Sequence, residues 1–260
     1  MKRAGDVMAP RAALRRTTAA PTARRGKAKA FALPYTTVDV VIFRVRDEAL
    51  QVLLVQRPGD AAEPFPGRWA LPGGFVDTAR DPDLLGCAQR KLREKTGVRS
   101  PYLEQLGSWG SAARDPRGWS ATHAYFALIA SAEVPLAKGA NAADVAWFPA
   151  DQAKRRGPLA FDHEHILLAA LERLRNKVEY TSLPAYLLSE PFTLPQLQRT
   201  YEIVLGRGVD KSGFRTRMLA AGFLEEVGVV PSESNRPPLG YRLKNRASPA
   251  VFPRMFSPRA

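Results

Sequence analysis

Residues 69–98, WALPGGFVDTARDPDLLGCAQRKLREKTGV, decide the fold of the central part of this 260-residue chain. The apolar segment Trp69–Val76 contains the pair Gly73-Gly74 and predicts a strand that leads into a tight turn. A polar loop follows, and the spacing of apolar residues then predicts a helix over residues 82–95. Gly97 is expected to end that helix, because glycine tolerates the left-handed backbone of a helix C-cap. The segment is therefore a strand–loop–helix unit.

Two runs rich in β-branched residues precede this unit. Thr37–Val45 and Leu50–Arg57 flank a charged turn, and their composition predicts a hairpin or two adjacent strands. Further elements are expected as a strand at residues 122–130, a short strand near residues 145–148, and a helix at residues 161–178 that closes the first domain. Strands and helices in this order predict an α/β fold.

The C-terminal part has a different pattern. Thr193 and Gln196 have the spacing of a capping box, which predicts a helix that begins there. The expected elements are a helix at 193–205, a second helix at 210–221, a strand at 223–230, a proline-rich turn at 231–238 and a strand at 239–243. Helix, turn, helix and β-wing is the order of a winged helix-turn-helix domain.

Basic and polar residues cluster on the expected second helix and on the wing. The candidate DNA-binding residues are Lys211, Ser212, Arg215, Arg217, Asn235 and Arg236. In a helix-turn-helix domain, the first turns of the second helix enter the major groove of double-stranded DNA. The opposite, apolar side of this helix carries Phe214, Met218 and Leu219, which are expected to pack on the preceding helix. A winged helix also serves protein contacts in some proteins, and the basic charge here favours DNA.

The net charge of +14 is unevenly distributed along the chain. Residues 1–35 hold nine basic residues and one acidic residue, residues 36–175 hold 18 and 17, and residues 176–260 hold 12 and seven. Clustered positive charge favours a polyanionic partner that touches the two flanks. Residues 1–35 lack apolar periodicity and are expected to be a disordered basic arm. A later start at Met8 and an Arg-rich organellar transit peptide are the alternatives.

The composition predicts neither a membrane protein nor a secreted one. No apolar run approaches the roughly 20 residues of a membrane span, and no apolar signal-peptide core follows the basic start. Cys87 is the single cysteine and lies within an expected helix, so it is predicted to be a small core residue. These features predict a cytoplasmic protein.

Residues 71–76, followed by Arg90-x-Leu92-x-Glu94-x-x-Gly97-Val98, resemble the Nudix box, the loop–helix–loop signature of the Nudix hydrolases. In active members of that family, three glutamates of the box helix hold magnesium. Only Glu94 remains here, and Lys91 and Lys95 stand in the other two places. The helix also begins two residues late, so the first box glutamate has no counterpart and Arg80 or Asp81 falls in its place.

These replacements change the predicted chemistry. Positions 91, 94 and 95 lie within one helical turn, so their side chains are expected to point at one site. Lys, Glu and Lys in place of three carboxylates change the local formal charge from −3 to +1. Such a site disfavours a hard divalent cation and favours a diphosphate. We therefore predict no catalytic residue and no bound metal in the degenerate box, which consists of Arg90, Lys91, Glu94 and Lys95.

Two alternatives remain for this domain. Carboxylates outside the box, such as Glu104 or Glu133, could rebuild a metal site. The chain would then be an active Nudix hydrolase that cleaves ADP-ribose or a related nucleoside diphosphate.

Loss of hydrolysis need not remove ligand binding, because the backbone donors of a glycine turn approach phosphate closely. The candidate ligand-binding residues are Arg57, Gly73, Gly74, Lys91, Lys95, Arg114 and Arg117. Trp69 and Trp119 either stack on a nucleobase or cover the core, and the core is favoured for Trp69. The histidines, at positions 123, 163 and 165, lack metal-ligand spacing and are predicted to be structural.

Residues 71–76, 90–97, 114–120, 159–163 and 188–194 together resemble the Nudix-related transcriptional regulators (NrtR). The resemblance implies an α/β/α Nudix sandwich with a mixed sheet, followed by a C-terminal winged helix-turn-helix domain. It also implies a homodimeric repressor of NAD metabolism genes that needs no cofactor. Such a repressor binds operator DNA and releases it when the Nudix-like domain binds ADP-ribose. A different sugar nucleotide is the alternative effector.

The expected domain boundaries follow from these patterns. They are a basic arm at residues 1–35, a Nudix-like domain at 36–160, a linker helix at 161–180, a winged-helix domain at 181–246 and a C-terminal tail at 247–260.

Overall fold

The computed structural model describes residues 33–97, 102–130, 136, 142–231 and 237–253, and the chain from Pro34 onward forms one compact unit. Within these ranges, no helix is long and apolar enough to cross a membrane. Almost all of the expected basic arm lies outside the described residues, as do Val98, Glu133 and the wing residues Asn235 and Arg236.

The predicted hairpin is present at the start of the described chain. Strands β1 (Tyr35–Arg46) and β2 (Ala49–Gln56) pair antiparallel, with Phe43 opposite Val52. The two turn residues, Asp47 and Glu48, both have positive φ angles, of 51° and 56°. Positive φ at both turn residues is the backbone of a type I′ hairpin turn.

A mixed sheet surrounds this hairpin, as the fold prediction requires. Its other strands are β3 (Trp69–Ala70), β4 (Gly73–Phe75), β5 (Tyr102–Ser111), β6 (Ser120–Leu128) and β7 (Asp144–Pro149). The order is β3-β2-β1-β6-β5, while β4 also pairs with β1 and β7 with β2. Strands β1 and β6 are parallel, and the other pairs are antiparallel. Strand β5 was missed in the sequence, because Gly107 and Gly110 interrupt its pattern.

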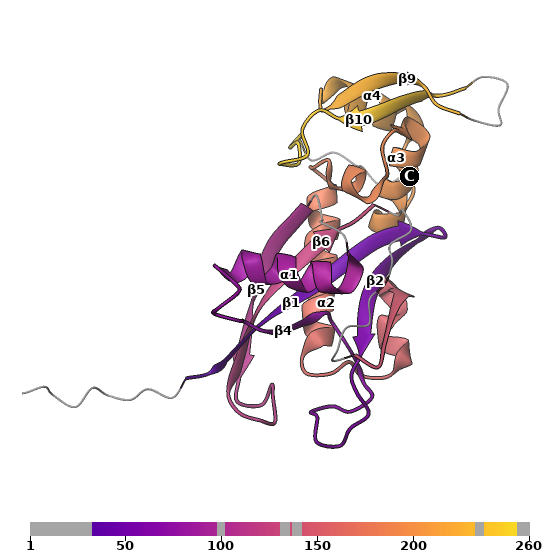
Figure 1. Cartoon of the computed structure of the whole chain (residues 1–260). Helices are drawn as coiled ribbons and strands as arrows, with labels where there is room; N and C mark the ends of the chain where they lie inside the picture. Colours follow the sequence, from indigo (N-terminus) through magenta and orange to yellow (C-terminus); the bar gives the residue numbers. More distant parts are fainter. Residues whose placement is uncertain (1–32, 98–101, 131–135, 137–141, 232–236, 254–260) are drawn as a thin grey trace, which may run out of the picture. The chain divides into compact units, whose positions relative to one another are not determined.

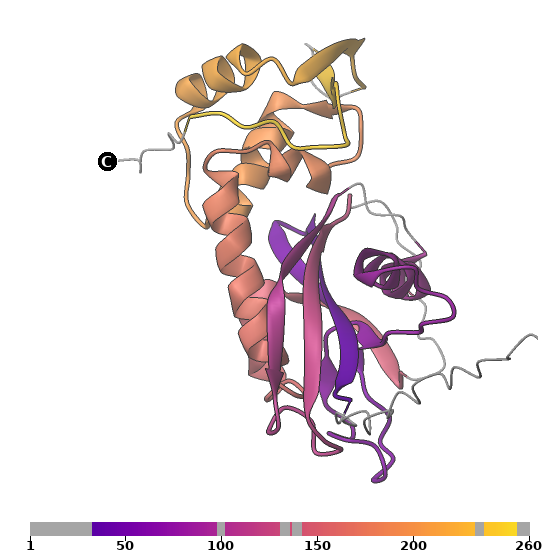
Figure 2. The ribbon, with the colours of Figure 1, turned by 90° about the vertical axis from the view of Figure 1, so that its left-hand side faces the viewer.

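Helices cover both faces of this sheet. Helix α1 (Leu84–Thr96) lies on one face and helix α2 (His163–Val178) on the other, as Figure 2 shows. The side chains of β1 alternate accordingly: Val40 and Ile42 share a core with α1, whereas Val41 and Phe43 share a core with α2. The 3-10 helix η1 (Ala150–Arg156) connects β7 to the segment before α2.

The ends of α1 are capped as the sequence indicates. The Asp83 side chain accepts a hydrogen bond from the backbone N–H of Gly86, 2.7 Å away, at the N-terminus. Gly97 ends the helix in the left-handed conformation, with φ 66°, which confirms the predicted C-cap. Cys87 is fully buried in this helix, as predicted, and burial raises the pKa of its thiol to about 11.

The C-terminal part is a winged helix. Its elements are η2 (Leu183–Leu187), β8 (Phe192–Thr193), α3 (Leu194–Leu205), α4 (Lys211–Ala220), β9 (Leu224–Val229) and β10 (Leu239–Leu243) (Figure 1). Both hydrogen bonds of the predicted Thr193–Gln196 capping box are present. The strands form a three-stranded sheet in the order β8-β10-β9. The predicted helix, turn, helix and β-wing order is therefore confirmed.

One hydrophobic core joins α2 to the winged helix. Leu174 of α2, Tyr186 of η2 and Tyr201 of α3 are fully buried in the same cluster. The Tyr201 hydroxyl donates to the carbonyl of Thr181 at 2.8 Å, and Arg175 Nε donates to the carbonyl of Val204 at 3.2 Å. Helix α2, which packs against the mixed sheet, thus also packs against the winged helix.

Candidate functional site

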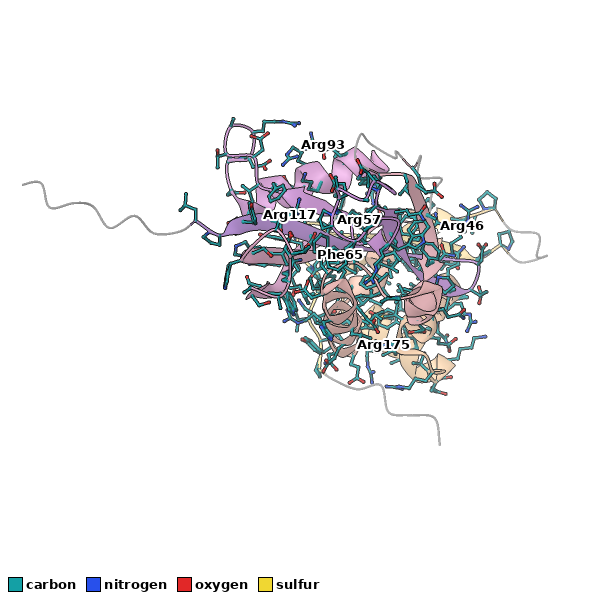
Figure 3. All side chains as sticks on the ribbon, turned by 90° about the horizontal axis from the view of Figure 1, so that it is seen from below. Arg46, Arg57, Phe65, Arg93, Arg117 and Arg175 are labelled. Carbon is teal, nitrogen blue, oxygen red and sulfur yellow. The ribbon has the colours of Figure 1, made fainter. Side chains whose placement is uncertain are left out.

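A cavity of about 670 Å³ opens beside the glycine turn of β4. All seven predicted ligand-binding residues line it: Arg57, Gly73, Gly74, Lys91, Lys95, Arg114 and Arg117. They come from the residue after β2, from β4, from α1 and from the loop before β6. Arg57 and Arg117, both labelled in Figure 3, line this cavity. Contact of these residues with a ligand stays a prediction.

The two glycines form part of the cavity wall because no larger residue fits there. A Cβ atom on Gly73 would collide with the Asp39 carboxylate and would lie 2.6 Å from the backbone oxygen of Val38. Gly74 has a φ of 144°, and a Cβ there would lie 2.9 Å from Lys91 Nζ. The backbone of β4 therefore approaches both β1 and the ammonium group of Lys91 closely.

The box helix presents cations to the cavity. Arg90, Lys91 and Lys95 line it, and burial, followed by the charge of Lys91, lowers the pKa of Lys95. Glu94 is not among the lining residues, so the expectation that positions 91, 94 and 95 point at one site is wrong for Glu94. One helical turn separates Glu94 from Arg90, and its carboxylate accepts a hydrogen bond from Arg90 at 3.0 Å instead.

Asp81 has a structural role that the sequence analysis did not assign. Arg90 donates two hydrogen bonds of 2.6 Å to its buried carboxylate, and these bonds hold the pKa of Asp81 far below its ordinary value. Asp81 also accepts a hydrogen bond from the N–H of Asp77 at 2.8 Å. Asp81 thus fixes the loop before α1 to the helix.

The acidic residues of the described chain do not form a metal site. Within the described ranges, no three or more His, Cys, Asp or Glu side chains are arranged to hold a metal ion. Glu104, an alternative ligand in the sequence analysis, instead accepts hydrogen bonds from Arg173 at 3.0 Å and from Lys177 at 2.5 Å, both on α2. Glu133 lies outside the described residues. The absence of a bound metal stays a prediction.

A buried charge network lies beside the cavity. Asp39 accepts a hydrogen bond from Arg114 at 2.8 Å, and His163 Nε2 lies 3.4 Å from the same carboxylate oxygen. Arg114 also donates two hydrogen bonds, of 2.8 Å and 3.0 Å, to Asp162, the residue before α2. The backbone N–H of Leu71 donates to His163 Nδ1, so the proton of this ring lies on Nε2 and faces Asp39.

This network revises the expected role of Arg114 and bears on His163 and Asp39. The Arg114 side chain is only 3% exposed and is engaged by two carboxylates, so its primary role is structural. The predicted structural role of His163 is confirmed by its hydrogen bond to Leu71. Asp39 was not predicted, although a single acidic residue inside an apolar strand indicates a buried charge that needs a partner.

The network predicts a pH dependence of stability. Burial raises the pKa of Asp39, but the contact with His163, the charge of Arg114 and a hydrogen bond from Thr122 outweigh it and lower that pKa from 3.8 to about 2. Stabilisation from the ionised carboxylate is therefore present above about pH 4 and is lost as the pH falls toward 2. The free energy of unfolding of the native protein, measured by urea denaturation, should fall by about 2 kcal/mol over this range because of Asp39. Asp39→Asn should lack this fall in the free energy of unfolding. A variant whose stability changes with pH as that of the native protein does would contradict the assignment.

The remaining two arginines have different surroundings. Arg57 donates to Glu63 at 2.8 Å and to the Pro64 carbonyl at 2.6 Å, and its guanidinium lies 5.1 Å from the ring centre of Phe161. Arg117 donates to Asp115 at 3.0 Å and 2.8 Å, and its side chain is 38% exposed. Arg117 is therefore held in place beside the cavity with part of its guanidinium open to solvent.

The two tryptophans left open by the sequence have separate environments. Trp69 is partly buried and packs edge-on against Phe148, at 4.7 Å between ring centres, which confirms the core position. Trp119 is 51% exposed and therefore does not cover the core.

The DNA-binding candidates that the structure describes lie on the outer side of α4. Lys211, Ser212 and Arg215 are exposed and Arg217 is half-buried. Phe214 and Met218 are buried, as predicted, and Phe214 packs against Tyr201 of α3. Leu219 is 42% exposed, so its predicted place on the apolar side is wrong. It directly follows Met218, and the 100° turn between neighbouring helical residues carries it out of the interface.

Comparison with known proteins covers both parts of the chain. Residues 35–170 match the Nudix domain family, and residues 184–243 match the NrtR DNA-binding winged helix domain. The chain is 46% identical over 223 residues to the ADPR-responsive transcriptional repressor NtrR of Acinetobacter baylyi, a match that covers 86% of this chain and 87% of that protein.

Two solved structures show the same relationship. The crystal structure of Shewanella oneidensis NrtR in complex with a 27mer DNA is 43% identical, with a TM-score of 0.76, and the match covers 84% of this chain and 98% of that one. The Nudix domain of the same protein in complex with ADP ribose is 44% identical, with a TM-score of 0.51, and the match covers 58% and 94% of the two chains.

Proposed function

This chain belongs to the family of Nudix-related transcriptional regulators (NrtR), and from that premise we propose that it is a transcriptional repressor that senses ADP-ribose without hydrolysing it. Its winged helix binds double-stranded operator DNA, and its Nudix domain binds the effector. We further infer that it regulates NAD metabolism genes as a cytoplasmic homodimer.

The observation that carries this proposal is the set of cations at the cavity. Lys91 and Lys95 occupy the box positions where a hydrolase needs carboxylates, and both line the same cavity as Arg57 and Arg117. Ammonium and guanidinium groups donate charge-assisted hydrogen bonds to phosphate oxygens. The same groups repel a divalent cation, which supports binding of a diphosphate without its cleavage.

The regulatory step is a thermodynamic linkage between two sites. ADP-ribose binds more tightly to the form of the dimer whose two recognition helices are wrongly spaced for the operator half-sites. Operator DNA and ADP-ribose then weaken each other's binding by the same factor. A tenfold or hundredfold release corresponds to about 1.4 or 2.8 kcal/mol of differential affinity.

Operator binding measured with and without ADP-ribose tests the proposal. The operator is first selected from random DNA with the protein itself and then labelled. We expect saturating ADP-ribose to weaken binding of this operator by about tenfold to hundredfold. Fluorescence anisotropy gives the two affinities. ADP-ribose should be recovered intact after incubation with Mg²⁺, since the box lacks two of its carboxylates.

A matched variant separates the two functions of the protein. Lys91→Ala/Lys95→Ala should keep the operator affinity of the native protein but lose most of its response to ADP-ribose. Unchanged operator affinity of the native protein in saturating ADP-ribose would refute the sensing role. Magnesium-dependent release of AMP would instead support the active hydrolase.

A further inference from the structure

Arg44 is a buried cation away from the cavity beside β4. It lies on β1, is 8% exposed and does not line that cavity. Asp39, which does line the cavity, is five residues earlier on the same strand, about 16 Å away at about 3.3 Å per residue. Among the residues that the structure describes, no carboxylate forms an ion pair with Arg44. A buried charge without a counter-charge is unfavourable, so this guanidinium needs an explanation.

Two neighbouring side chains hold the guanidinium in a fixed orientation. Gln51 lies opposite Arg44 on β2, and its Oε1 accepts a hydrogen bond from Arg44 Nε at 2.8 Å. The guanidinium also stacks on Trp147 of β7, with its central carbon 4.2 Å from the ring centre. Stacking uses the face of the guanidinium and the bond to Gln51 uses Nε. The N–H groups of its two terminal nitrogens therefore remain as donors without an acceptor in the described part of the chain.

Trp147 supplies a further donor without a partner. Its Nε1 is buried and has no hydrogen-bond acceptor within the described ranges. The indole N–H can only donate, and leaving such a group buried and unbonded costs about 1–3 kcal/mol. Because the indole ring lies against the guanidinium, both residues offer N–H groups in one place. What this place lacks is an acceptor.

The local charge favours an anionic acceptor. Arg46, labelled in Figure 3, is two residues further along β1, and its ion pair with Asp47 is long, at 4.0 Å, between side chains that are 45% and 80% exposed. Burial, followed by the charge of Arg46, lowers the pKa of Arg44 to about 10, so Arg44 stays protonated at neutral pH. A guanidinium with free terminal nitrogens matches the oxygens of phosphate, to which it donates two parallel hydrogen bonds.

We propose that Arg44 and Trp147 form a second anion site, which binds a small oxyanion of the phosphate class. The terminal nitrogens of Arg44 donate to the oxyanion, and Trp147 Nε1 provides a third donor. The site is separate from the cavity beside β4 and does not depend on the effector. It belongs to the β1–β2 hairpin, whose turn residue Glu48 forms an ion pair with Arg199 of α3. The anion would therefore bind near the contact between the hairpin and the winged helix.

The indole N–H signals of the full chain in nitrogen-15 NMR spectra test this site. The chain has four tryptophans, and the signal that disappears in Trp147→Phe is that of Trp147. Titration with inorganic phosphate at constant ionic strength should shift this signal until it saturates. Arg44→Lys keeps the charge but loses the paired donors, and it should bind phosphate about tenfold more weakly, since one charge-assisted hydrogen bond contributes about 1.5–3 kcal/mol.

A matched control separates this site from the cavity beside β4. Lys91→Ala/Lys95→Ala alters that cavity and should leave the Trp147 titration unchanged. A Trp147 signal that does not move, or moves without saturating, would overturn the proposal. So would an equal phosphate affinity in Arg44→Lys and the native protein, or a Trp147 shift that is lost in Lys91→Ala/Lys95→Ala. None of these results affects the sensing of ADP-ribose, which the operator experiment tests separately.

Discussion

Arg114→Ala should lower the free energy of unfolding by about 3–5 kcal/mol, because it leaves the carboxylate of Asp39 buried without its cationic partner. Asp39 and Arg114 are both almost inaccessible to solvent, and their side chains are 6% and 3% exposed. The substitution also removes the hydrogen bonds to Asp162 that fix the start of α2. Urea denaturation followed by circular dichroism measures the loss.

Two further variants accompany this test, a control on the surface and a milder substitution at Arg114. Arg93→Ala removes an exposed arginine from α1 and should change stability by less than about 0.5 kcal/mol. Should Arg114→Ala prove too unstable to purify, Arg114→Lys retains the charge but loses the double contact with Asp162, and it should fold with a smaller loss of stability. A loss of under about 1 kcal/mol in Arg114→Ala would show that the network is not a source of stability.

Lys211→Ala/Arg215→Ala is expected to weaken operator binding by about a hundredfold or more. Both side chains are exposed on α4, the second helix of the helix-turn-helix, and each direct contact with DNA contributes about 1–3 kcal/mol. The salt dependence of binding distinguishes the types of contact. Each lost phosphate contact lowers the slope of log affinity against log salt by about 0.9, whereas a lost base contact weakens discrimination between operator sequences.

The control for this variant is another exposed arginine. Arg80→Ala removes a positive charge from the box loop, where the side chain is 62% exposed. It should leave operator affinity within about twofold of native. That result would show that the lower net charge alone does not explain the weaker operator binding of Lys211→Ala/Arg215→Ala. Equal affinities for Lys211→Ala/Arg215→Ala and the native protein would remove α4 from the DNA interface.

The sequence predicted most elements because their signals are local. The Thr193–Gln196 capping box, the Gly97 C-cap and the β1–β2 hairpin each depend on residues within one turn or one strand pair. Strand β5 was not recognised, although its partner β6 is the next strand along the chain, because Gly107 and Gly110 weaken the local strand pattern. Local signals therefore predicted most of the fold, and an element without such a signal was missed.

The site shows the same division. Lys91 and Lys95 could be identified from their places in the box, whereas the commitment of Arg114 to Asp39 could not, because 75 residues separate the two partners. The structural role of Asp81 depends similarly on the direction in which the Arg90 side chain turns.

The core shared by α2, η2 and α3 determines where a regulatory motion can occur. Leu174, Tyr186 and Tyr201 are fully buried together. A close-packed protein interior has low compressibility and transmits strain from one helix to the next. A hinge between the effector domain and the winged helix of one subunit would have to open this interior. In the proposed homodimer, the distance between the two recognition helices would then be set by how whole subunits meet one another. Effector control in that dimer would be a property of the pair rather than of the single chain.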